Sequence, residues 1–388
     1  HIPSSHSIVI KSVVMITASL ISTGILYRYG QKVSALLQDS IYAAAYGAIG
    51  ISIGILISSV VGFLHILFVF LVYRKSSGRK EQLKNQDRGQ HIFRMLMGTA
   101  LPFMIYALLG RGILLLDGIL FIRQKEGTAD TVLLWGNYYG KCLPVLGIMI
   151  LFCILFHEGY IRRIIYFMDR EEFRMARERM AEFMQHIILI SFPVAVFTAV
   201  FSENLLNLFF KGNNAPLAQA VATGSILIPL FAISYACAEL LVRMRKMRYV
   251  LSLEGIAAIT HGILMIVLLQ SMGDSLFGIW IAQIVPLAVF TVLSFILVLR
   301  GIQYRIDYMR RLAFPAATAA AAGLVCLAFN KLLSSFAGST VSMIICIPVG
   351  IVIYIILLLI LKAISEDEIQ KLPLAGMILF IGKLTRLL

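Results

Sequence analysis

Ten long apolar runs dominate this chain and leave it few ways to fold. Each is close to the ~20 residues that an α-helix needs to cross the hydrocarbon core of a bilayer, and the second is long enough to tilt. The runs are continuous and do not alternate residue by residue, which favours helices over the strands of a barrel. We therefore predict an all-α fold, a polytopic membrane bundle of about ten transmembrane helices. The runs cover roughly 8–28, 42–73, 95–122, 132–157, 186–209, 217–242, 249–271, 276–299, 312–334 and 340–363.

The composition points to the same class of protein. Hydrophobic residues make up 60% of the 388 residues and charged residues 14%, well under the roughly 25% charged residues of a soluble domain. All five cysteines fall inside the apolar runs, and no CxxC or Cys/His metal spacing occurs. The cysteines are therefore predicted to pack as small side chains, and neither a metal site nor a cofactor is predicted.

The second apolar run carries small residues at nearly regular intervals. A stripe of this kind lets two membrane helices approach closely. The run has neither the preceding strand nor the GxGxxG spacing of a phosphate-binding loop, so we predict helix packing. The small residues are Ala43, Gly47, Gly50, Gly54, Ser58 and Gly62.

The basic residues are distributed unevenly between the two sides of the predicted bundle. With residue 1 inside and successive loops on alternate sides, 26 of the 34 Lys and Arg fall inside and six fall outside. The remaining two lie within apolar runs. This excess predicts that both chain ends are cytoplasmic. The net charge of +14 is thus interpreted as a topology signal in a chain whose partner is the lipid bilayer, and no nucleic-acid partner is predicted.

Two cations, Arg111 and Lys141, lie inside predicted spans. At ~1.5 Å per residue, Arg111 is about sixteen residues or ~24 Å from the inner end of its span, and Lys141 is about nine residues or ~14 Å from an outer end. Ionisable residues at such depth are costly and mark functional sites. We expect both cations to face a hydrated cavity, a carboxylate or an anionic ligand.

A carboxylate on the Arg111 helix offers a purely structural alternative. Asp117 could pair with Lys141 across adjacent helices, although Arg111 would then stay unpaired. If the cations line a cavity for an anion instead, Asn137 and Tyr138, which are one turn from Lys141, could add hydrogen bonds to a phosphate or sugar. Both interpretations stay open at this stage.

Two further pairs of ionisable residues share a helix face. Glu239 and Arg243 are four residues apart, which predicts a local salt bridge. Glu254 and His261 are seven apart, so they could form an ion or proton relay or could simply be packing residues. No GxSxG or HExxH motif occurs, and the longest outer stretch, about 29–41, holds one acid. We therefore predict a protein that is not an enzyme.

Four stretches, taken together in their order and spacing, resemble the polysaccharide-transporter branch of the multidrug/oligosaccharidyl-lipid/polysaccharide exporter superfamily. Within this branch the chain is similar to stage V sporulation protein B and the lipid II flippases. The stretches are YRYGQKVSALLQDSIYAAAYGAIGISIGILISS (27–59), LPFMIYALLGRGILLLDGILF (101–121), LWGNYYGKCLP (134–144) and SEDEIQKLPLAGMILFIGKLTRLL (365–388).

The resemblance implies how the chain is divided. That family has two six-helix lobes around a central cavity, followed by two extra helices. Aligned by the four stretches, this chain lacks the first four helices, so a partial two-lobed exporter fold and a fragment of a longer protein are expected. Residues 1–75 would be the remainder of the N-terminal lobe and 76–92 a cytoplasmic linker. Residues 93–300 would be the second lobe, and 301–388 two extra transmembrane helices with an amphipathic tail.

The resemblance also implies a function. The family moves lipid-linked sugars with a diphosphate headgroup, so we expect a flippase in the bacterial plasma membrane that translocates a polyprenyl-diphosphate-linked oligosaccharide or peptidoglycan precursor by alternating access. Arg111 and Lys141 would face its cavity, and Na+ or H+ would be its coupling ion. A cation-coupled multidrug exporter, which would favour carboxylates in the cavity, stays open. So does a membrane glycan polymerase, which would need a large outer loop.

Overall fold

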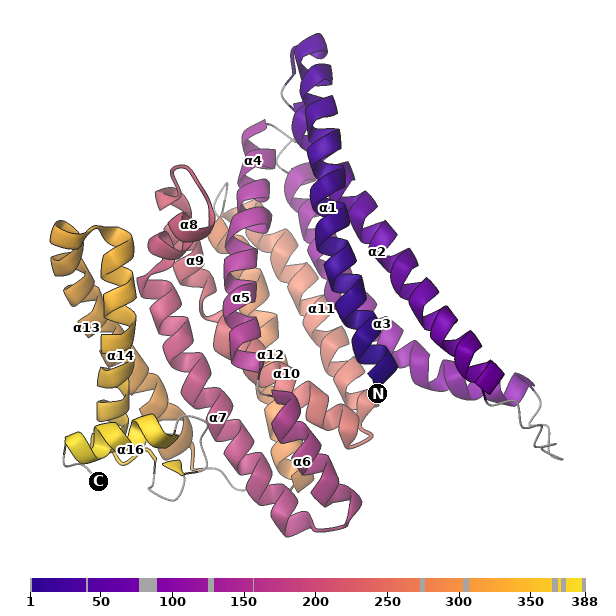
Figure 1. Ribbon diagram of the computed structural model, residues 1–388. Helices are drawn as coiled ribbons and strands as arrows, with labels where there is room; N and C mark the ends of the chain where they lie inside the picture. The colour runs from indigo at the N-terminus through magenta and orange to yellow at the C-terminus, as the bar shows by residue number, and fades with distance from the viewer. Residues whose placement is uncertain are drawn as a thin grey trace. The chain divides into compact units, whose positions relative to one another are not determined.

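The computed structural model describes residues 2–39, 41–76, 89–124, 129–155, 157–272, 276–302, 307–364, 369–370 and 375–385. Every regular element among these residues is a helix, and ten helical segments are long and apolar enough to cross a membrane (Figure 1). The predicted all-α membrane bundle is therefore confirmed. The elements are α1 (Ile2–Leu37), α2 (Ile41–Ser76), α3 (Gly89–Gln124), α4 (Ala129–Asn137), η1 (Tyr138–Cys142), α5 (Leu143–Ile154), α6 (His157–Asp169), α7 (Phe173–Val200), α8 (Ser202–Phe209), α9 (Ala215–Gly224), α10 (Leu227–Arg243), α11 (Met247–Ser271), α12 (Leu276–Ile302), η2 (Met309–Ala313), α13 (Phe314–Ala337), α14 (Ser339–Ile360) and α16 (Ala375–Leu384).

Three spans are built from more than one element. The span Asp130–Ile154 runs through α4, the π-helical turn η1 and α5, and the span Ala215–Arg243 joins α9 to α10. A second π turn, η2, precedes α13. Single π turns inside helices are rare and occur frequently at functional sites. The turn η1, with the sequence YYGKC, therefore merits a close look.

The chain divides into two compact units, His1–Gly89 and Gln90–Leu388. The division falls at the end of the segment predicted as a linker, 76–92, of which 77–88 lie outside the described residues. The first unit holds α1 and α2, and the second holds all later elements. The assignment of 1–75, 93–300 and 301–388 to parts of an exporter stays a prediction.

Small residues bring α1 and α2 into close contact within the first unit. A Cβ atom added at Gly50 would lie 2.5 Å from the Cα of Thr23, a distance that real atoms do not adopt. The hydroxyl of Ser22 donates a hydrogen bond of 2.6 Å to the carbonyl of Gly50, and Gly54 packs directly on Ser19. The small-residue stripe therefore serves helix packing, as predicted.

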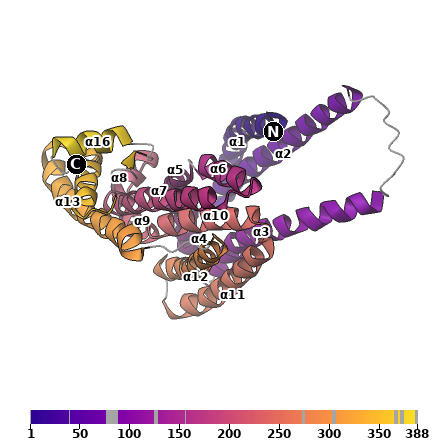
Figure 2. The same ribbon diagram turned by 90° about the horizontal axis from the view of Figure 1, so that it is seen from below.

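The second unit is centred on α7 and α10. In Figure 2, α13 lies beside α7, α7 beside α10, and α10 beside α12, which in turn packs against α11. In the most apolar window of the α7 span and of the α9–α10 span, 67% of the residues are buried, against 0% for α1 and 11% for α2. Large side chains of α7 such as Phe183, Ile187 and Ile188 fill this core.

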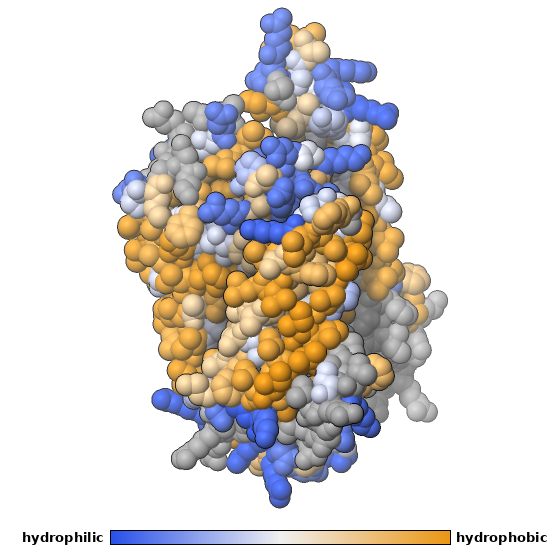
Figure 3. All heavy atoms as spheres, turned by 90° about the vertical axis from the view of Figure 1, so that its left-hand side faces the viewer, coloured by the Kyte–Doolittle hydropathy of each residue, from blue (hydrophilic) through white to orange (hydrophobic). Residues whose placement is uncertain are grey.

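The outer helices of the second unit present an apolar face. Figure 3 shows a continuous hydrophobic band over the side formed by α13 and α14. Leu324, Leu332 and Phe336 of α13 are among the exposed large side chains. A bilayer accommodates such a surface without cost. The short helix α16 packs on α14, with Ile378 buried and Phe380 exposed. The predicted amphipathic tail is otherwise largely outside the described residues.

Candidate functional site

A buried imidazole joins three helices of the second unit. The Nε2 atom of His261, on α11, lies 2.7 Å from the Oδ1 atom of Asp117 on α3. Its Nδ1 atom lies 2.7 Å from the backbone carbonyl oxygen of Ala282 on α12. Asp117 is 1% exposed and His261 is 5% exposed. Buried polar groups are stable in such surroundings only when they are hydrogen-bonded, and here each satisfies the other.

The pair between Asp117 and Lys141, one of the two alternatives left open by the sequence, is not formed in the described structure. The carboxylate faces α11 and bonds to His261, whereas the Lys141 amine donates a hydrogen bond of 3.0 Å to Oδ1 of Asn214. Asp117 lies on α3 and Lys141 in η1, on neighbouring segments as the sequence suggested, but the two side chains bond to different partners. Sequence spacing could not distinguish these partners because all of them are far apart along the chain.

Aromatic rings close off the Asp117 cluster. Tyr138 has no exposed surface, and its ring lies 5.2 Å from that of Trp135 and 5.0 Å from that of Trp280. The Tyr138 hydroxyl lies within electrostatic range of Asp117, and the side chain of Gln283 faces it. Tyr138 therefore does not line an open site in this conformation, and its place in substrate binding stays a prediction.

Three buried polar atoms of this cluster have no hydrogen bond of good geometry among the described residues. They are Oδ2 of Asp117, the hydroxyl of Tyr138 and Nε1 of Trp280. Buried polar atoms without partners are rare in folded proteins, and each calls for an explanation such as a catalytic or ion-binding role. The cluster thus has unused hydrogen-bonding capacity as well as a tight ion-pair geometry.

Glu254 makes no direct hydrogen bond with His261 among the described residues, and a relay through the two stays a prediction. Both ring nitrogens of His261 already have a partner, Ala282 and Asp117, so neither bonds to the Glu254 carboxylate. Glu254 lies beside Gly110 of α3, where a Cβ atom on the glycine would be 3.8 Å from its Oε1 atom. The hydroxyl of Tyr106 is also within its electrostatic range. The seven-residue spacing places both side chains on α11, but they contact different residues of α3, Gly110 and Asp117.

Lys141 lies in the π turn η1 and is half-buried. Its partner, Asn214, is 1% exposed and directly precedes the span Ala215–Arg243. The amide of Asn214 is itself fixed, because its Nδ2 atom donates to the carbonyl of Phe210 at 2.8 Å and to Oδ1 of Asn207 at 3.1 Å. The long lysine side chain therefore reaches the end of a neighbouring span. Among the described residues no carboxylate pairs with it.

The remaining predicted site residues are placed less fully. Arg111 belongs to α3, but its side chain lies outside the described residues. Asn137 ends α4 and is half-buried. The predicted local pair is confirmed, since Nε of Arg243 lies 2.8 Å from Oε1 of Glu239. No three His, Cys, Asp or Glu side chains in the described part of the chain gather as metal ligands.

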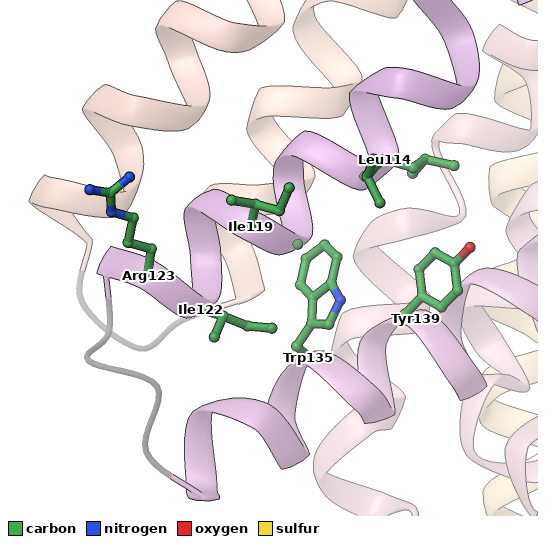
Figure 4. A pocket seen from close by; sticks show the side chains of 8 residues that line it. Leu114, Ile119, Ile122, Arg123, Trp135 and Tyr139 are labelled. Carbon is green, nitrogen blue, oxygen red and sulfur yellow. The ribbon is translucent and has the colours of Figure 1, made fainter. Parts of the chain in front are cut away.

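A groove of 1020 Å³ runs between α3 and the α4–η1 segment (Figure 4). Trp135 and Tyr139 project across it toward α3, and Arg123 lies at its far end. Gly118 makes room for the indole, because a Cβ atom there would meet Trp135 at 3.1 Å. The groove is apolar apart from one guanidinium and one phenol. Its lining comprises Leu114, Leu115, Gly118, Ile119, Ile122, Arg123, Trp135 and Tyr139.

A second buried histidine lies just beyond a span, at the start of α6. The His157 ring is 2% exposed and meets Phe183 edge-on at 5.1 Å, with Tyr235 at 5.8 Å. Neither ring nitrogen has a hydrogen-bond partner among the described residues. Burial, together with the nearby His186, lowers the pKa of His157 from 6.5 to about 4. His157 is therefore neutral at physiological pH.

Sequence reasoning missed several groups that complete these sites. Asn214 follows a loop glycine and asparagine, which signals a turn but no lysine partner. The backbone carbonyl of Ala282 has no sequence signal at all. Trp280, one of two tryptophans, is unusual enough to draw attention, but nothing in its neighbours indicates that it would cover Tyr138.

Comparison with known proteins gives one weak match that covers nearly all of this chain. The chain is 22% identical over 382 residues to "Stage V sporulation protein B" of Bacillus subtilis (strain 168), and the match covers 96% of this chain and 70% of that protein. No family model matches the chain. No solved structure matches it. The similarity covers nearly the whole of this chain, which has ten apolar helices. It supports the predicted superfamily at a coarse level.

Proposed function

We propose that this chain is part of a flippase that moves a polyprenyl-diphosphate-linked oligosaccharide or peptidoglycan precursor across a bacterial plasma membrane. The observations that carry the transport class are the similarity to "Stage V sporulation protein B" over 96% of this chain and the ten apolar helices. Alternating access around a site within the membrane is the mechanism that such bundles use. Both chain ends would be cytoplasmic, as the distribution of basic residues predicts.

The chemistry of Lys141 supports an anionic substrate. Its amine bonds to a neutral amide oxygen, Oδ1 of Asn214, so its positive charge is not cancelled by a carboxylate among the described residues. Two of its three N–H donors remain for a ligand. Arg123, which is exposed at the end of the apolar groove, adds a second cation of the same kind. An apolar groove with a guanidinium at its end suits a lipid with a diphosphate headgroup.

The two alternatives have less support. A multidrug exporter of the same superfamily would need carboxylates free to receive a cation, whereas Asp117 is bonded to His261. A glycan polymerase would need a large outer loop, but α1 extends to Leu37 and fills most of the stretch 29–41. Transport of an anion therefore accounts for the site better than either.

The proposal is tested by flipping assays on the protein expressed from its complete reading frame. Proteoliposomes would contain a fluorescent nitrobenzoxadiazole-labelled polyprenyl-diphosphate sugar, and chemical bleaching by dithionite would report which leaflet holds the label. We expect Lys141→Gln to slow flipping about tenfold or more, because a hydrogen bond to a charged group contributes ~1.5–3 kcal/mol. Lys331→Gln, which removes an exposed lysine from the end of α13, is the matched control.

Two results would contradict the proposal. One is equal flipping of a neutral polyprenyl glycoside and the diphosphate lipid, which would mean that the anionic group is not recognised. The other is wild-type flipping of the diphosphate lipid by Lys141→Gln. Efflux of a cationic dye without any lipid flipping would favour the multidrug exporter.

A further inference from the structure

We propose that Asp117 and His261 form a proton-binding latch that joins α3, α11 and α12 at one ring only while a proton is shared between them. Proton binding at this site does not depend on the proposed function. Use of the proton as the coupling ion for transport does rest on the proposed function.

The latch follows from counting protons. The carbonyl oxygen of Ala282 can only accept a hydrogen bond, so the Nδ1 atom of His261, 2.7 Å away, must carry a hydrogen. The 2.7 Å contact between Nε2 and Oδ1 of Asp117 then needs one more proton. It lies either on the imidazolium, facing a carboxylate, or on a protonated Asp117, facing a neutral ring. In both cases the structure shows the proton-loaded state.

Loss of the shared proton breaks one of the two contacts. A carboxylate accepts a stronger hydrogen bond than a backbone carbonyl, so the neutral ring keeps its hydrogen on Nε2, toward Asp117. The lone pair on Nδ1 would then face the carbonyl oxygen of Ala282 at 2.7 Å, in a site where His261 is 5% exposed. Two acceptors cannot stay in contact in such a medium without a donor between them. The ring must therefore release α12.

The surroundings favour a proton as the ligand. The described titratable groups nearest the pair are Tyr138 and, behind it, Cys142, both on η1. From α12 the pair meets the carbonyl of Ala282, while the neutral side chains of Trp280 and Gln283 pack at Tyr138. Glu254, two turns away on α11, faces Gly110 instead. No second carboxylate among these groups is available to complete a shell for a metal cation.

The test compares the pH dependence of thermal stability in wild-type protein and in Asp117→Asn, in detergent and without substrate. In the variant the amide N–H donates to the neutral ring, so the contact needs no titratable proton. Between pH 7 and 9.5 we expect the wild-type melting temperature to fall several degrees further than that of Asp117→Asn. Asp117→Ala, which lacks the contact at every pH, should melt lower throughout.

Equal pH dependence of wild type and Asp117→Asn would overturn the latch. A melting temperature that responds to Na+ at constant pH, and not to pH, would overturn it in favour of a metal cation. If Asp117→Asn does not fold, nitrogen NMR of histidine-labelled wild-type protein replaces the comparison. The latch predicts that Nδ1 of His261 loses its proton as pH rises, and an unchanging signal would refute it. None of these measurements requires transport, so they separate the latch from the proposed function.

Discussion

The two buried histidines of the second unit show how partners, more than burial, decide what a side chain does. His261 is 5% exposed and His157 is 2% exposed, so the two rings are nearly equally shielded. His261 has an acceptor at each nitrogen. His157 has aromatic rings at its sides and no described hydrogen-bond partner. The first site therefore holds a proton, whereas the second excludes one.

This comparison gives the two sites opposite responses to pH. The pKa of His157 lies below its value in an unfolded chain, so between pH 6.5 and about 4 the unfolded chain binds more protons than the folded one. Stability from this site is complete above pH 6.5 and is lost as pH falls. The latch at His261 behaves in the reverse way, because its contact with α12 exists only with the shared proton bound and is lost as pH rises.

The largest expected effect comes from removing the latch histidine. His261→Ala leaves the Asp117 carboxylate buried with no partner on α11, which typically costs about 3–5 kcal/mol of the free energy of unfolding. Unfolding in mixed detergent micelles would measure it. Because the two groups act as a pair, the double variant with Asp117→Ala should be much less destabilised than the sum of the single variants. Additive losses would show that the two side chains do not interact.

A smaller effect is expected at the second histidine. The shift of the His157 pKa from 6.5 to about 4 corresponds to roughly 3 kcal/mol at most, at ~1.4 kcal/mol per pH unit. We expect the unfolding free energy of wild-type protein to fall by up to this amount as pH drops from 6.5 to 4. His157→Phe, which keeps a ring among the aromatic side chains, should remove this part of the loss. A wild-type response in that variant would show that His157 is not buried as a neutral ring.

The smallest effect is expected at Tyr138. Its hydroxyl has no hydrogen bond of good geometry in the described structure, so Tyr138→Phe should change the free energy of unfolding by less than about 1 kcal/mol at pH 7. Unfolding in detergent micelles would measure this change. A loss of more than about 2 kcal/mol would show that the hydroxyl has a hydrogen bond in the folded protein.

Local spacing was sufficient for several parts of the molecule. The ten spans follow from the length of continuous apolar runs, since backbone groups in lipid must bond within their own helix. The ion pair between Glu239 and Arg243 follows from the four-residue period of a helix. The close contact at Gly50 and Gly54 follows from their recurrence on one face of α2. Each of these features depends on residues near one another in sequence or on a repeated pattern.

The candidate site required the tertiary structure. Asp117 and His261 are 144 residues apart, and Lys141 and Asn214 are 73 apart. The sequence determined that charged side chains would enter the membrane and that such charges need partners, because an unpaired ion is costly in a medium of low polarity. It could not determine which partner each would find, since that depends on how α3, η1 and α11 rotate and pack. Only the packed helices decided that Asp117 faces a histidine and that Lys141 bonds to an asparagine.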